Sequence, residues 1–215
     1  MRNATVMASV AVLGVMAVTG LARGNMLTNG GFDDNGGSID GWQVTGGNVT
    51  TNLHTTHTNP LGWVTNPVDG THFVGHGINT SNSYGALYQT VAVASGVEVT
   101  VDFSWKTLWN LAAEPAYVAI NNTSSAPSIS GNFFKGLESS CEYVDSYTGA
   151  MSSWAHVSET FDSAGYITVS VFTTDNGASS SAAYTAFDAV SVTPEPATIG
   201  LLCVGAAGML KRRNR

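Results

Sequence analysis

The sequence has little charge, few cysteines and few prolines. Only 11% of its 215 residues are charged, and it contains two cysteines and six prolines. So few cysteines exclude a disulfide-stapled scaffold, and a domain of about 170 residues needs no staples because it buries roughly 70% of its unfolded surface. With 43% hydrophobic residues, the chain is too apolar for disorder. We expect one folded domain between two terminal segments.

Basic residues are scarce in the middle of the chain. There, Lys106 and Lys135 stand against fourteen carboxylates, which gives a formal charge of −12. The other six basic residues lie near the ends: Arg2, Arg23, Lys211, Arg212, Arg213 and Arg215. A domain this acidic repels phosphate backbones, so we expect no nucleic-acid partner.

Sequence motifs of catalysis are also absent. The chain has no G-x-S-x-G, no HExxH and no P-loop pattern. The carboxylates could include a glycosidase pair, but sequence spacing does not show which two carboxyl groups face each other. We therefore expect no enzymatic activity and name no catalytic residue. A hydrolase remains an alternative.

The first 22 residues have the features of a signal peptide. Arg2 supplies a positive charge, residues 4–21 form an apolar run, and the small residues Gly20 and Ala22 stand at its end. This order predicts a secretory signal peptide over residues 1–22, with cleavage after Ala22. An uncleaved membrane anchor is the alternative.

The last 22 residues, 194–215, have three parts. Pro194-Glu195-Pro196 is followed by an apolar run at 199–210 and then by a basic end. Twelve apolar residues are few for a spanning helix, which needs about 20, and the basic end favours the cytoplasmic side. The order resembles the PEP-CTERM sorting signal of exported bacterial proteins. The residues that carry the resemblance are Pro194, Glu195, Pro196, Arg212 and Arg213.

The resemblance to this sorting signal implies where the protein is located and not what activity it has. It implies that an exosortase-type membrane transpeptidase recognises the tail and cleaves near Pro-Glu-Pro. The protein would then be exported to the cell envelope, outer surface or extracellular matrix, and a short apolar C-terminal helix would hold it transiently in the membrane. A simple tail anchor is the alternative.

Between these ends, residues 23–193 have the pattern of an all-β domain. Apolar and polar residues alternate in 97–106, 166–172 and 187–192, between turns rich in Gly, Asn and Asp. A period of two predicts strands with one core face and one wet face, and hence a β-sandwich. In the last of these segments we expect Asp188, Val190 and Val192 to share a face.

Four short motifs follow one another along this domain. They are LTNGGFD at 27–33 followed by Trp42, NPVDGTHFVG at 66–75, LYQTV at 87–91, and AFDAVSV at 186–192. Their order resembles the bacterial jelly-roll domains of the galactose-binding-like superfamily, which includes many carbohydrate-binding modules. The resemblance implies a jelly-roll β-sandwich.

The same resemblance implies a structural calcium ion. In many of these jelly rolls Ca²⁺ joins the first and last strands, and Asp33 and Asp188 match the acids of those two motifs. Calcium takes six to eight oxygen ligands, so two carboxylates with nearby carbonyls would form a plausible site. The alternative is that both are ordinary strand-end carboxylates. We expect no other cofactor.

Two closely spaced histidine pairs raise the question of zinc. In a strand, His54 and His57 would point to opposite faces, and they could converge only at a turn. His72 and His76 would share a face but stand roughly 13 Å apart. Without cysteines or an HExxH helix beside them, we expect solvated loop histidines and no transition metal.

The five tryptophans fall into two groups. Trp42, Trp105 and Trp154 match core positions, and we expect them to be buried. Trp63 and Trp109, with Asn110, lie beside polar neighbours in expected loops, where exposed indoles could stack on sugar rings. The alternative is that these residues only pack their loops.

The cysteines are not expected to pair, because Cys203 lies in the apolar tail. Cys141 is then a free or buried thiol, with an intermolecular bridge as the alternative. The whole sequence favours a non-catalytic envelope or matrix protein. The alternative is a carbohydrate-binding module that recognises an exopolysaccharide through Trp63, Trp109 and Asn110.

Overall fold

The computed structural model describes residues 24–46, 49–78, 84–110, 116–129, 141–174 and 183–195, which form two facing antiparallel sheets. The first sheet has the order β1 (Gln43–Gly46), β6 (Tyr84–Ala92), β11 (Tyr166–Thr174), β8 (Ala116–Thr123) and β9 (Tyr143–Tyr147). The second has the order β10 (Ala155–Asp162), β7 (Glu98–Asn110), β12 (Ala183–Pro194), β5 (Phe73–Ile78) and β2 (Val49–His54). The prediction of an all-β sandwich is confirmed.

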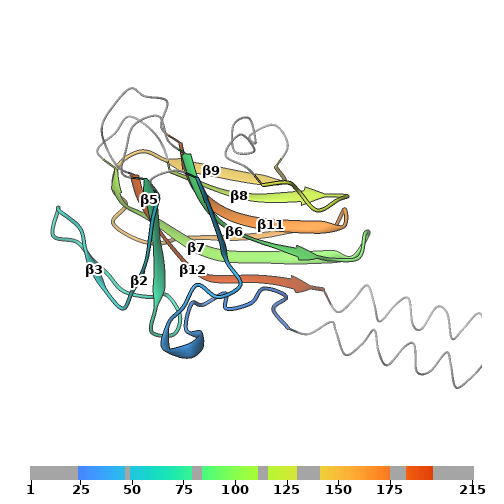
Figure 1. Cartoon of the computed structure of the whole chain (residues 1–215), viewed down its shortest axis with the longest axis horizontal. Coiled ribbons are helices and arrows are strands. Elements are labelled where there is room, and N and C mark those ends of the chain that lie inside the picture. The colour runs from blue at the N-terminus through green and yellow to red at the C-terminus, as the bar shows by residue number, and fades with distance from the viewer. Residues whose placement is uncertain are drawn as a thin grey trace, which may run out of the picture.

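Two smaller elements complete the described chain. A 3-10 turn, η1 (Asp34–Gly36), precedes β1. A hairpin of β3 (His57–Thr58) and β4 (Val64–Thr65) forms a separate two-stranded sheet. This hairpin projects from one end of the sandwich, and the C-terminal end of β12 lies at the other (Figure 1).

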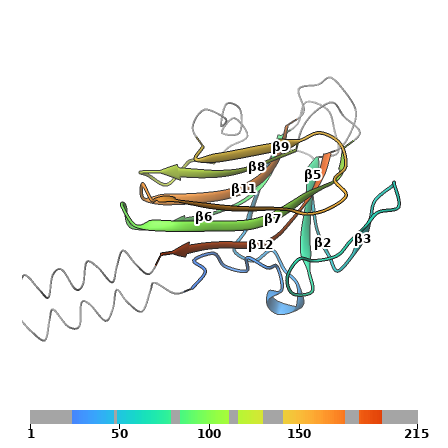
Figure 2. The ribbon, with the colours of Figure 1, turned by 180° about the vertical axis from the view of Figure 1, so that it is seen from behind.

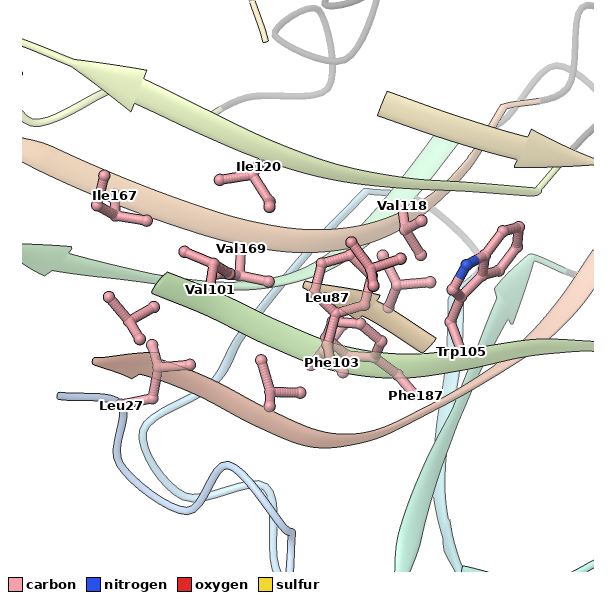
Figure 3. Close-up of a cluster of buried hydrophobic side chains, with 14 of the residues drawn as sticks. Leu27, Leu87, Val101, Phe103, Trp105, Val118, Ile120, Ile167, Val169 and Phe187 are labelled. Atoms are coloured by element: carbon pink, nitrogen blue, oxygen red, sulfur yellow. The ribbon is translucent and has the colours of Figure 1, made fainter. Parts of the chain in front are cut away.

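The core lies between the two sheets, as the alternating patterns predict. Along β7 the side chains of Val99, Val101, Phe103 and Trp105 are buried together on one face. They meet apolar side chains of the facing sheet (Figure 3), among them Leu87, Val118, Ile120, Ile167 and Val169. Trp42 is also buried in this cluster and packs edge-to-face on Phe187.

The faces expected to be wet are partly buried. On the outer face of the first sheet, Thr168 and Ser170 are both almost fully buried. Thr168 Oγ1 pairs with Thr90 Oγ1 at 2.8 Å, so its hydroxyl is satisfied by the neighbouring strand. On the outer face of the second sheet, Lys106 is buried under the β3–β4 hairpin. The alternation therefore locates the core face correctly but does not show that the other face is open.

The last strand departs from a simple period of two. In β12, Asp188 pairs with Ser104 and Ser191 pairs with Asp102, so β12 carries one extra residue at this point. This β-bulge contains Ala189 with φ 53°, and it reverses the alternation. Val190 and Val192 consequently face the core with Phe187. The expectation that Asp188 shares their face is wrong.

The two ends of the described chain lie side by side. The Met26 N–H donates to the Val192 carbonyl at 2.9 Å, and the Asn25 amide donates to the Val190 carbonyl at 2.8 Å. The chain therefore enters and leaves the sandwich at one end, away from the β3–β4 hairpin (Figure 2). The predicted signal peptide, residues 1–22, lies outside the described residues.

Candidate functional site

The β3–β4 hairpin, residues 57–65, forms an arm that is fixed by one asparagine. The Asn59 amide donates to the Leu108 carbonyl at 3.1 Å, which ties the arm to β7. The Asn59 side-chain oxygen accepts the N–H groups of Leu61 and Trp63, at 3.0 and 2.9 Å. Gly62 closes the turn with φ 80°, a conformation that favours glycine. The loop that presents Trp63 is thus ordered by its own hydrogen bonds.

The tip of the arm exposes a group of apolar side chains. Leu61 is 64% exposed, Val64 58% and Trp63 40%. The expectation that Trp63 lies in a loop is confirmed. An indole that is partly exposed and held by a fixed loop can present one face to the apolar C–H face of a sugar ring.

Trp109 and Asn110 lie at the end of β7 and not in a loop. The strand continues past the expected end at residue 106 because β12 pairs with it as far as Asn110. Only the main chain of these two residues is described. Asn59 of the arm bonds to the carbonyl of Leu108, the residue that directly precedes Trp109 in β7. Whether the two indoles form one platform remains a prediction.

A buried lysine lies at the root of the arm. The Lys106 ammonium donates to Thr65 Oγ1 at 2.9 Å and to the Ser152 carbonyl at 3.3 Å. Burial lowers the pKa of Lys106. This amine thus joins the arm to the segment before β10. The sequence did not identify Lys106 as a site residue, because the residues next to it in the chain give no sign of what covers it.

His54 and His57 meet at the turn between β2 and β3. Their ring centroids are 5.0 Å apart, and Tyr184 lies next to both, with its hydroxyl 2.8 Å from His54 Nε2. Burial lowers the pKa of both imidazoles. They are half-buried, so the expectation of solvated loop histidines is wrong for this pair. The two imidazoles converge because a turn separates β2 from β3, which is the condition that the sequence indicated.

The two histidines of the second pair, His72 and His76, lie in different surroundings. His76 lies in β5 and is fully buried between the sheets, so the expectation of a solvated loop histidine is wrong for it too. Its Nδ1 is 2.9 Å from Thr51 Oγ1. Burial lowers its pKa to about 4, although a main-chain hydrogen bond to Gly85 opposes the shift. His72 instead lies 2.9 Å from the Asp33 carboxylate. In the described part of the chain no three His, Cys, Asp or Glu residues are grouped to hold a metal ion.

The two calcium candidates lie in different surroundings. Asp188 is fully buried, and its carboxylate accepts main-chain N–H groups of Val68, Asp69 and Ala189. Burial raises its pKa to about 6 despite these bonds, and the charge of Asp33 adds to the rise. The Asp33 carboxylate, partly exposed, accepts from the Thr71 N–H and hydroxyl. A buried carboxylate close to a second one suits a cation, but all four of their oxygens already accept hydrogen bonds.

A second polar and aromatic surface covers the outer face of the first sheet. The Tyr88 hydroxyl donates to Gln43 Oε1 at 2.7 Å, and the Tyr117 and Phe172 rings stack at 4.9 Å. Cys141, a free and partly buried thiol, packs beside them. Tyr88 and Phe172 are buried on this face, whereas Trp63 of the arm is 40% exposed.

The start of the predicted tail belongs to the folded sheet. Pro194 is the last residue of β12, and Glu195 is still hydrogen bonded to β7. Pro196, Arg212 and Arg213 lie outside the described residues, as does the apolar run between them. Within the ranges that the structure describes, no helix has the length and apolar character needed to span a membrane.

Comparison with protein families matches residues 192–215 to a model described as the PEP-CTERM protein-sorting motif. The chain ends in a PEP-CTERM sorting motif. It is therefore an exported protein of the exosortase-sorted kind, as the tail predicted. No curated protein matches the sequence.

Solved structures similar to this PEP-CTERM protein are β-sandwich domains. The TmCBM61 module in complex with β-1,4-galactotriose is 16% identical, with a TM-score of 0.50, over 80% of this chain and 99% of that one. The CBM22-1 xylan-binding domain of Paenibacillus barcinonensis Xyn10C is 12% identical, with a TM-score of 0.47, over 80% and 96%. The K3 adhesin domain of Lys-gingipain from Porphyromonas gingivalis is 16% identical, with a TM-score of 0.48, over 76% and 96%. At 16% identity the likeness to the TmCBM61 module shows the fold alone.

Proposed function

We propose that this exported protein is a non-catalytic envelope or matrix protein that binds a polysaccharide through its β3–β4 arm. The observation that carries the proposal is the indole of Trp63, which is 40% exposed on a loop that Asn59 holds in place. A fixed loop lowers the entropy lost on binding, because the platform is already ordered. The galactotriose complex of the TmCBM61 module supports a glycan as the ligand of a sandwich of this kind.

The position of the arm supports the same function. The PEP-CTERM tail leaves the sandwich at the end of β12, and the arm projects from the opposite end (Figure 1). A protein held by its tail would therefore present Trp63 away from the membrane. The alternative, a purely structural matrix role, would need no exposed indole.

The experiment is a binding assay with the full chain in detergent. The probes are β-1,4-galacto-oligosaccharides and the exopolysaccharide of the producing cell. Trp63→Ala should weaken binding by about ten-fold or more, since it removes the stacking surface. Leu61→Ala is the matched control, because it shortens an exposed apolar side chain of the same loop that has no aromatic face.

Three results would contradict this assignment. If no glycan binds at millimolar concentration, the structural alternative holds. If Gln43→Ala abolishes binding and Trp63→Ala does not, the ligand lies on the outer face of the first sheet. The reaction mixture should contain no shortened glycan, and turnover would instead favour a hydrolase.

We also propose that a structural calcium ion binds at Asp33 and Asp188. The proposal is supported by the full burial of Asp188, which raises the pKa of its carboxyl group, and by the nearby charge of Asp33, which adds to the rise. Calcium would supply positive charge there and hold the loop before β1 against β12. Further oxygens would have to come from main-chain carbonyls.

A further inference from the structure

The first two residues of the sorting motif are paired with the folded domain. Pro194 is buried and is the Cα partner of Val99 in β7. The Glu195 N–H then donates to the Glu98 carbonyl at 2.9 Å, which continues the ladder past the proline. No linker therefore separates the sandwich from the motif, and Figure 2 shows β12 ending beside β7 where the chain leaves the sheet.

The acidic side chain of the motif is held as well. Thr100 Oγ1 donates to the Glu195 carboxylate at 2.5 Å. Thr100 also lies 2.8 Å from Thr160 Oγ1 of β10. A threonine hydroxyl has one proton, so Thr100 gives its proton to Glu195 and accepts the proton of Thr160. Glu195 is thus bound through both its main chain and its side chain.

An enzyme that binds this motif as an extended peptide would need the same groups of Glu195 that β7 binds in the folded domain. Extended peptides are bound through their main-chain N–H and C=O groups and through pockets for alternate side chains. Both the N–H and the carboxylate of Glu195 are engaged with β7. The enzyme and the sheet therefore compete for the same residue.

We propose that the folded domain latches its own sorting motif, and that Thr100 is the latch residue. Processing then acts on chains whose last β12 residues are undocked, either before the strand pairs or after it opens locally. In the processing step, a peptide bond of the tail breaks, its acyl group passes to water or to an acceptor amine, and the C-terminal fragment leaves with a new amino terminus that takes up the proton. The proposal rests on the sorting role of the tail and not on glycan binding.

The first test removes the latch hydroxyl. Thr100→Val keeps the β-branched shape and deletes the donor to Glu195, whereas Thr160→Val deletes only the neighbouring hydroxyl. Loss of a hydrogen bond to a charged group should raise amide hydrogen exchange at Glu195 by roughly ten-fold. In the producing cell, pulse-labelled Thr100→Val precursor should be converted several-fold faster, and Thr160→Val should behave nearly as the wild type.

Two outcomes of this test overturn the proposal. Unchanged exchange at Glu195 in Thr100→Val would show that the hydroxyl does not hold the motif. Faster exchange with an unchanged rate of conversion would show that the latch does not limit processing.

The second test links the end of β12 to β7 by a disulfide. Ser191 and Asp102 are Cα partners just before the motif, and paired residues of adjacent strands are close enough for a disulfide. Oxidised Ser191→Cys/Asp102→Cys should not be converted, and reduction should restore conversion. Each single-cysteine variant serves as the control.

Processing of the tail of the oxidised double variant at the wild-type rate would contradict the proposal. If the wild-type tail is never cleaved in these cells, the sorting role itself fails. Amide exchange at Glu195 in the purified full chain still decides whether Thr100 holds the motif.

Discussion

Tyr184 lies directly over the main chain of Gly75 in the neighbouring strand. A Cβ atom on Gly75 would stand 2.4 Å from the Tyr184 hydroxyl oxygen and 2.5 Å from its ring carbon. The absence of a side chain at this position therefore allows Tyr184 to reach His54 and His57. The contact of Tyr184 with His57 thus joins the second sheet to the arm.

Gly75→Ala is expected to displace Tyr184 and lower stability. Overpacking of this kind costs about 1–3 kcal/mol, which corresponds to a fall in melting temperature of roughly 2–10 °C for a domain of this size. Gly31→Ala is the control, because its nearest neighbour would be at 3.8 Å. Thermal unfolding checks the prediction, and an equal effect of both substitutions would contradict it. The loss should shrink in a Tyr184→Leu background.

Asn59→Ala is expected to loosen the arm without unfolding the sandwich. The change removes the bond to the Leu108 carbonyl and the acceptor of the Leu61 and Trp63 N–H groups. Amide exchange of Leu61 and Trp63 should rise by about ten-fold, since each lost bond contributes about 1 kcal/mol. Asn66→Ala, a change at an exposed asparagine beside the arm, should leave both rates unchanged. Protection retained in Asn59→Ala would show that the loop is held by other contacts.

Alternation in the sequence predicted the core because successive side chains of a strand point to opposite faces, and one face of each sheet packs on the other sheet. Val99 and Phe103 illustrate this, since each lies where a period of two puts it. The extra residue around Ala189 could not be predicted, because a bulge depends on pairing with β7. The burial of Lys106 on the face expected to be wet could not be predicted either, because the residues that bind its ammonium, Thr65 and Ser152, are distant in the sequence.

The candidate site was predictable only in part. The loop position of Trp63 followed from its polar neighbours, whereas the strand position of Trp109 depended on pairing with residues more than 70 positions away. The role of Asn59 gave no local signal, because the carbonyl that it binds belongs to β7. Contacts between distant segments, and not local propensity, assemble this end of the molecule.

Chelation is expected to lower the melting temperature if calcium binds between Asp33 and Asp188. The full chain should unfold several degrees lower in excess chelator than in millimolar Ca²⁺, because a ligand of the native state alone stabilises it. Asp188→Asn should remove this difference, since it deletes the buried charge that would bind the ion. Asp145→Asn, at an exposed carboxylate of β9, is the control and should keep the calcium response. Identical melting curves with and without chelator would exclude the site.

His76 is expected to make the fold sensitive to acid. Its pKa is about 4 in the folded chain against 6.5 ordinarily, so between these values the unfolded chain binds a proton that the native state excludes. Stability from this group is therefore complete above pH 6.5 and is lost as the pH falls toward 4, by about 3 kcal/mol in all. Asp188 acts in the opposite direction, because its raised pKa of about 6 lets the native state take up a proton first. The two effects are separated by comparing wild type with His76→Gln in urea unfolding at pH 7.5, 6.0 and 4.5. The variant should lose less stability on acidification than the wild type, and parallel losses would mean that His76 does not carry the effect.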